Sequence, residues 1–200
     1  MTANPLFSNN VSWTGDNSGL YLKETESGPY TSLASYFRVA WSPFGAGLSL
    51  ILIERDASPA RRPVKLYLYD NEAMAKWILE EYASHFQQFR DLAEMSDLTF
   101  MKLESHKTEG TLETAIVESF KAPGYDISLR WAKLGKSYFV KLGQKDSATG
   151  KDEMFTAFVE SWEAGGSVNG VPLSGRVFPR THVGRPSSTA FLAFSETWLR

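Results

Sequence analysis

The sequence predicts a mainly β (α+β) fold: a single-domain antiparallel β-barrel, or a strongly bent sheet of about ten strands, with one long helix in the middle of the chain. Three observations support this. Apolar residues alternate with a period of two through most of the chain, which is the repeat of a half-buried strand. Turn-forming residues recur at roughly 8–12-residue intervals, as in a meandering antiparallel sheet. Only residues 71–95 show a long helical repeat.

The first third of the chain is expected to form a polar arm followed by strands. Residues 1–18 are rich in Asn, Ser, Thr and Gly and are assigned to the arm, and residues 19–200 to the domain. Turn residues such as those at 43–47 and 58–63 separate the apolar runs. Strands are therefore predicted over 21–26, 33–42, 48–54 and 64–69.

The helix is predicted from its composition and from the spacing of its apolar residues. Residues 71–95 contain no Gly or Pro, and Asp70 or Asn71 would cap the amino end. The apolar positions follow one another at spacings typical of one buried helix face; they are Ala75, Ile78, Leu79, Tyr82, Phe86, Phe89 and Ala93.

The rest of the chain returns to a strand-like period. Strands are predicted over 98–105, 111–121, 126–133, 136–143, 153–163, 171–178 and 189–199. A doubly wound parallel sheet is disfavoured because it needs a crossover helix for each parallel pair. A closed or strongly bent antiparallel sheet would instead enclose an interior wide enough for side chains or a small ligand.

Composition excludes several classes of protein. The chain has no Cys, which excludes a disulfide scaffold, a thiolate metal site and a cysteine nucleophile. Its formal net charge of −2 gives no support for nucleic-acid binding. No apolar run approaches the ~20 residues of a membrane span, and the first residues do not resemble a secretory signal. A cytoplasmic location is therefore expected.

Cofactor and metal motifs are not matched. Gly135-Lys136-Ser137 lacks the first glycine of a phosphate-binding loop, because Arg130 occupies that position. The three histidines, His85, His106 and His182, are not at metal-ligand spacing, and His106 is interpreted as a solvated turn residue. No cofactor and no metal are predicted.

Four residues are candidates for acid–base chemistry: His85, Glu118, Glu160 and Tyr82. Glu118 and Glu160 lie on largely apolar strand faces, where a buried carboxylate needs a partner or acquires a raised pKa. His85 lies at the edge of the apolar helix face, near Tyr82. The alternative for each is a packing role or an outward-facing charge.

Candidate ligand-binding residues come from the aromatic content and from the charged loop at 180–188. Aromatic residues make up 14% of the chain, and Trp and Tyr are suited to pocket walls. The loop at 180–188 combines cations, Gly and hydroxyls, a composition that can hold a carboxylate or phosphate. The alternatives are that the rings only fill a bent sheet and that the loop is exposed. The candidates are Tyr36, Arg38, Trp131, Phe158, Trp162, Arg180, His182 and Arg185.

The leading functional hypothesis is binding of a small, largely apolar molecule, with or without an acidic group, in an aromatic-lined barrel cavity. One alternative is a cofactor-free isomerase, cyclase or hydratase that uses a carboxylate/His pair in the same cavity. Another is a non-catalytic structural protein that self-associates, for example as a homodimer through edge strands or the arm.

The predicted arrangement resembles the calycin-like barrels in architecture. Ser12-Trp13-Thr14-Gly15 does not match the Gly-x-Trp start of many lipocalins, and the helix lies mid-chain instead of late. The resemblance is therefore one of architecture, and it does not assign a function.

Overall fold

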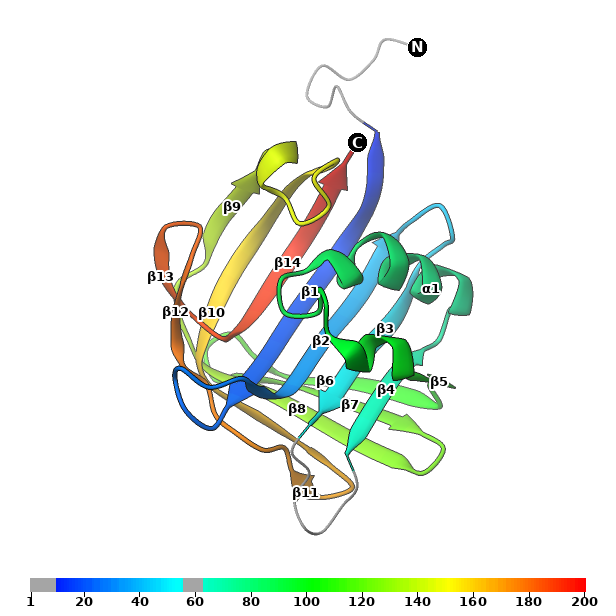
Figure 1. The fold of residues 1–200 in the computed structure, drawn as a ribbon, viewed down its shortest axis with the longest axis vertical. Coiled ribbons are helices and arrows are strands. Elements are labelled where there is room, and N and C mark those ends of the chain that lie inside the picture. Colours follow the sequence, from blue (N-terminus) through cyan, green and yellow to red (C-terminus); the bar gives the residue numbers. More distant parts are fainter. Residues whose placement is uncertain (1–9, 56–62) are drawn as a thin grey trace.

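The computed structural model describes residues 10–55 and 63–200. Within them the chain is mostly β, with a strongly curled sheet and one α-helix (Figure 1). This confirms the predicted fold class. The described residues include no helix that is long and apolar enough to cross a membrane.

Strand order explains how the sheet curls. The main sheet follows the order β5-β4-β3-β2-β1-β14-β10-β8-β7-β6, and β9 and β11 both pair with β10. The bounds are β1 Val11–Lys23, β2 Tyr30–Trp41, β3 Gly47–Glu54, β4 Val64–Tyr69, β5 Thr99–Lys102, β6 Ser105–Thr111, β7 Ala115–Ala122, β8 Tyr125–Leu134, β9 Tyr138–Leu142, β10 Glu153–Val168, β11 Val171–Pro172 and β14 Ala190–Leu199. A separate hairpin pairs β12 (Pro179–His182) with β13 (Arg185–Ser188).

The long strand β10 carries the sheet from one layer to the other. Its first half pairs with β14 and β9, and its second half with β8 and β11. At the other side the chain crosses between layers in two residues: Leu103 N donates to Tyr69 O of β4 at 2.7 Å, and Glu104 N donates to Lys121 O of β7 at 2.8 Å. Strands β6–β8 consequently lie behind β1–β4 (Figure 1).

The folded-over sheet has two apolar cores. The inner core lies between the two layers and includes Leu20, Leu52, Phe120, Trp131 and Leu192. The outer core lies on the opposite face of β1–β4, β10 and β14, where the helix covers the sheet; it includes Trp13, Phe37, Ile78, Tyr82 and Trp198. Strands β1 and β2 therefore bury both faces, which is why their sequences are apolar on both sides of the alternation.

The helix is shorter than predicted. α1 spans Glu72–Glu81, and Asn71 Oδ1 accepts a hydrogen bond from Met74 N at 3.2 Å as the expected amino-terminal cap. Beyond it the chain continues in 3₁₀ turns, η1 (Ala83–His85) and η2 (Ala93–Asp97), instead of helix to residue 95. Phe86 and Phe89 still reach the outer core. Because 3₁₀ turns also repeat every three residues, apolar spacing alone does not distinguish them from a helix.

Two further predictions need correction. Residues 11–18, assigned to a polar arm, form the first half of β1, while 1–9 lie outside the described residues. The sheet also contains one parallel pair among its described strands, β4 with β5. Their connection includes α1, and a parallel pair needs such a crossover.

Candidate functional site

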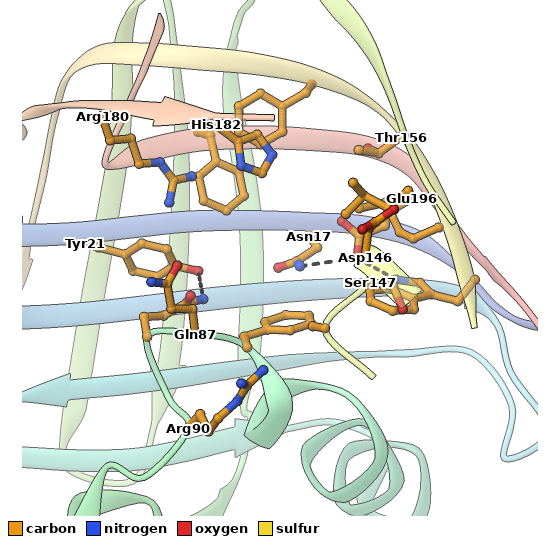
Figure 2. A pocket seen from close by; sticks show the side chains of 18 residues that line it. Asn17, Tyr21, Gln87, Arg90, Asp146, Ser147, Thr156, Arg180, His182 and Glu196 are labelled. Carbon is orange, nitrogen blue, oxygen red and sulfur yellow. Dashed lines mark hydrogen bonds between the residues drawn. The ribbon is translucent and has the colours of Figure 1, made fainter. Parts of the chain in front are cut away.

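A cavity of about 470 Å³ lies on the outer side of the sheet, next to the outer core (Figure 2). Strands β1, β10 and β14 form its floor, and the β12–β13 hairpin and the segments at 86–90 and 142–148 form its walls. The volume is in the range of small-molecule sites. The predicted cavity inside the curl is absent from the described residues, because the side chains of the inner core pack in that space.

Stacked rings form the apolar wall of the cavity. The rings of Phe158 and Phe191 stack with centroids 4.7 Å apart, and the His182 ring stacks on Phe158 at 4.7 Å. Phe86 and Trp198 stack at 6.1 Å. The Phe191 ring lies over Gly19, where any Cβ would be 2.4 Å from it, so glycine at this position of β1 makes room for the ring.

A β-bulge in β14 places a carboxylate in the cavity. Between the pairs Phe155↔Thr197 and Ala157↔Phe194 the register shifts by one residue, and Ser195 at this point has a φ of 50°. The Ser195 amide donates to Asp16 Oδ1 at 3.0 Å. Because the extra residue reverses the alternation, Glu196 lies on the cavity side of β14.

Glu196 is held by a buried polar network. Its Oε1 accepts from Trp198 Nε1 at 2.8 Å and from Asn17 Nδ2 at 3.4 Å. Asn17 Oδ1 in turn accepts from Ser35 Oγ at 3.1 Å. Burial raises the pKa of Glu196 to about 7, and the two hydrogen bonds only partly oppose this effect. The carboxyl therefore changes its protonation state near neutral pH.

The β12–β13 hairpin carries the cationic side of the cavity. Val183 and Gly184, with φ values of 49° and 71°, form its turn, and Arg180 and His182 line the cavity. Burial, with a smaller effect of Arg180, lowers the pKa of His182 to about 4, so the imidazole is neutral. The Arg180 guanidinium lies 5.1 Å from the centre of the Phe191 ring, and its Nε is buried without a hydrogen-bond partner.

A tyrosine completes the polar lining. Tyr21 Oη accepts a hydrogen bond from Gln88 Nε2 at 2.6 Å, and both residues line the cavity. Burial raises the pKa of Tyr21, so its hydroxyl stays protonated at neutral pH.

Three of the predicted ligand-binding residues line this cavity: Phe158, Arg180 and His182. Two more predicted residues lie beside it. Glu160 follows Phe158 on the same face of β10, and its Oε2 is buried without a hydrogen-bond partner. Arg185 is exposed on the hairpin, 5.2 Å from the centre of the Tyr138 ring.

Glu118, Tyr36 and Arg38 meet elsewhere, at the rim of the inner core. Glu118 is 4% exposed and accepts from Arg38 Nη2 at 3.2 Å, Thr108 Oγ1 at 2.8 Å and His106 Nε2 at 2.6 Å. Tyr36 Oη accepts from Arg38 Nε at 3.2 Å and lies 3.1 Å from His106 Nε2. This network joins β2 to β6 and β7 across the two layers. His106, predicted to be a solvated turn residue, is part of it.

The remaining predicted residues do not line the cavity. Tyr82 is buried in the outer core against Trp13 and Trp198, with ring centroids 5.8 and 5.1 Å away. Trp131 lies in the inner core and donates to Gly19 O at 2.9 Å. His85 and Trp162 are exposed.

Sequence reasoning missed Glu196, Asn17 and Tyr21. Glu196 is not among the candidates from the sequence, and Asn17 lies in the segment assigned to the arm. A signal for Glu196 exists in the sequence. Phe191 and Ala193 stand at odd-numbered positions and Trp198 at an even-numbered one, although all three face the outer core. An apolar alternation that changes parity indicates a bulge between its two halves.

No group of three or more His, Asp or Glu side chains in the described part of the chain is arranged to hold a metal ion. Comparison with known proteins adds no assignment: no family model, no curated protein and no solved structure matches the chain. The resemblance to calycin-like barrels therefore stays one of architecture.

Proposed function

We propose that the protein binds a small, largely apolar molecule in the outer cavity. The observation that carries this proposal is the ring-lined space of about 470 Å³ with a few buried polar groups, the usual composition of a small-molecule site. Burying about 200 Å² of apolar ligand surface would supply roughly 5 kcal/mol before ordering costs.

Phe158→Ala is expected to weaken ligand binding about tenfold or more, because it removes the ring at the centre of the His182–Phe158–Phe191 stack. Native mass spectrometry of protein purified without denaturation would reveal a copurified molecule. Quenching of the intrinsic tryptophan fluorescence, to which Trp198 of the cavity wall contributes, by a panel of aromatic, fatty and polyketide-like compounds would give the affinities.

Phe139→Ala is the matched control, since Phe139 is 66% exposed and stacks on Phe155 away from the cavity. It should leave the affinities unchanged. The proposal fails if no copurified molecule and no compound of the panel binds, or if both variants weaken binding equally.

A second candidate function is cofactor-free proton transfer, as in an isomerase, cyclase or hydratase. It is favoured by the pKa of Glu196, about 7, at a cavity that also holds the neutral imidazole of His182. A carboxyl group with this pKa exists in both protonation states at neutral pH and can act as general acid or base. His182 would orient the substrate through a hydrogen bond.

If the cavity is catalytic, Glu196→Gln should lower turnover at least about 100-fold while binding changes little, because glutamine keeps the shape but cannot exchange a proton. The measurement is solvent-deuterium incorporation into a bound ligand, followed by NMR. Equal incorporation by the wild type and the variant would exclude Glu196 as the acid–base group.

A further inference from the structure

The two sides of the cavity differ in charge, and this bears on the ligand that the proposed function leaves unidentified. Figure 2 shows Arg180 and Arg90 on one side and Glu196 and Asp146 on the other, with the aromatic rings between them. Building on the proposed binding function, we infer that the cavity selects a monoanionic acid: its carboxylate lies against Arg180, and an uncharged oxygen acceptor on its ring-sized body meets Glu196.

The Arg180 side chain is prepared for an anion. Its Nε is buried without a partner, and no carboxylate of the described residues forms an ion pair with the guanidinium. A desolvated donor without an acceptor is costly, and a planar guanidinium binds a carboxylate through two parallel hydrogen bonds. The guanidinium carbon lies 5.1 Å from the centre of the Phe191 ring, a cation–π contact that holds the group beside the cavity. A ligand carboxylate would therefore satisfy a group that the protein itself leaves unpaired.

The geometry of Glu196 decides which of its oxygens meets the ligand. The N–H groups of Trp198 and Asn17 both donate their hydrogen bonds to Oε1 of Glu196. The neutral acid must therefore carry its proton on Oε2, since Oε1 already accepts two hydrogen bonds. The Oε2–H group then donates to an acceptor in the cavity, such as a ketone or ether oxygen. The raised pKa of Glu196 supports this arrangement up to neutral pH.

The neighbouring charges determine which end of the ligand lies next to Glu196 and which lies next to Arg180. Asp16 of β1 and Asp146 of η3 (Gln144–Asp146) bring negative charge to the Glu196 side. Arg90 and Arg180 bring positive charge to the other side, where His182 is neutral. An anionic group next to Glu196 would meet unfavourable electrostatics, whereas the same group next to Arg180 is attracted.

Three matched probes test both ends of the inferred ligand. Benzoylpropionate has the ring, the ketone and the carboxylate, phenylbutyrate lacks the ketone, and benzoylpropionamide lacks the charge. Calorimetric titration at about pH 6 should give the tightest binding for benzoylpropionate, by about tenfold over the amide and several-fold over phenylbutyrate. At about pH 8.5 the advantage over phenylbutyrate should disappear, because ionised Glu196 no longer donates a hydrogen bond.

Arg180→Met should reduce the affinity for benzoylpropionate at least about tenfold and leave the amide nearly unchanged. Arg185→Met is the matched control: Arg185 lies on the same hairpin, is exposed and does not line the cavity. It should change neither affinity by more than about twofold. The thermal unfolding temperature of each unliganded variant shows whether the hairpin remains folded.

The inference is overturned if the acid and the amide bind equally, if Arg185→Met has the same effect as Arg180→Met, or if none of the three probes binds. Equal binding of the acid and the amide leaves the proposed binding function intact, because the ring body is still held. The proposed function itself fails only if no copurified molecule is found and no compound of the panel binds, or if Phe158→Ala and Phe139→Ala weaken binding equally.

Discussion

Glu196→Gln is expected to increase the free energy of unfolding by up to about 3 kcal/mol above about pH 7, and to leave it nearly unchanged below about pH 4.5. Burial raises the pKa of Glu196 from the ordinary 4.5 to about 7. The folded state therefore binds the proton more tightly than the unfolded chain. The stability that this proton provides is present in full below about pH 4.5 and is lost as the pH rises through about 7. Glutamine has no proton to lose, so the variant avoids this loss.

Urea unfolding of the wild type and the variant across this pH range measures the effect. Glu163→Gln is the control, and its effect on the free energy of unfolding should have the opposite sign. Glu163 is an exposed carboxylate whose pKa is lowered by Lys133 and Arg130, so its loss should slightly reduce stability at neutral pH. Parallel pH curves for the wild type and Glu196→Gln would contradict the assignment of Glu196 as a buried, neutral acid.

His182 has the opposite effect on stability, over a pH range that overlaps with that of Glu196. Its pKa is lowered from the ordinary 6.5 to about 4, so the unfolded chain binds this proton more tightly. In Glu196→Gln, stability should therefore decrease as the pH falls from about 6.5 to about 4, whereas in the wild type the proton that Glu196 binds between about pH 7 and 4.5 offsets most of this loss. The difference between the two curves still isolates Glu196, because His182 contributes equally to the wild type and to the variant; this difference grows between about pH 4.5 and about pH 7.

Alternation along the chain was sufficient to predict the sheet, because a half-buried strand must repeat its apolar residues every second position. The run from Leu33 to Trp41 lies in β2, and Leu48 to Glu54 lies in β3, as predicted. The period of the apolar residues does not indicate which distant strands pair with one another, and this pairing is what folds the sheet over. The position of the cavity depends on that pairing, because it decides which face the helix covers and which face the strands β6–β8 cover.

The candidate site was predicted only where its residues also formed a local pattern. Arg180 and His182 were found because the loop at 180–188 concentrates cations and hydroxyls. Glu196 was missed because its burial results from a one-residue bulge and from contacts with β1. Glu118 was a candidate because its strand face is largely apolar, and it is 4% exposed. Its partners, Arg38 and His106, could not be identified, because they come from strands that only the fold brings together.

Glu118→Ala is expected to decrease the free energy of unfolding by about 3 kcal/mol. The substitution removes the acceptor for three donors, from Arg38, His106 and Thr108, at the place where β2 meets β6 and β7. Glu118→Gln should cost less, because its carbonyl oxygen still accepts. Urea unfolding of both variants measures these changes. Benzoylpropionate affinity should not change, because the network does not line the outer cavity.

A double-mutant cycle with Arg38→Ala isolates the contact between the layers. Arg38 and Glu118 should show a coupling free energy of about 1 kcal/mol or more, since Glu118 is almost fully buried although Arg38 is partly exposed. Glu109→Ala is the control on β6: its ion pair with Lys107 is exposed on both sides, and its removal should cost less than about 0.5 kcal/mol. If Glu118→Ala instead preserved stability but abolished ligand binding, the functional site would have to be moved from the outer cavity to this network.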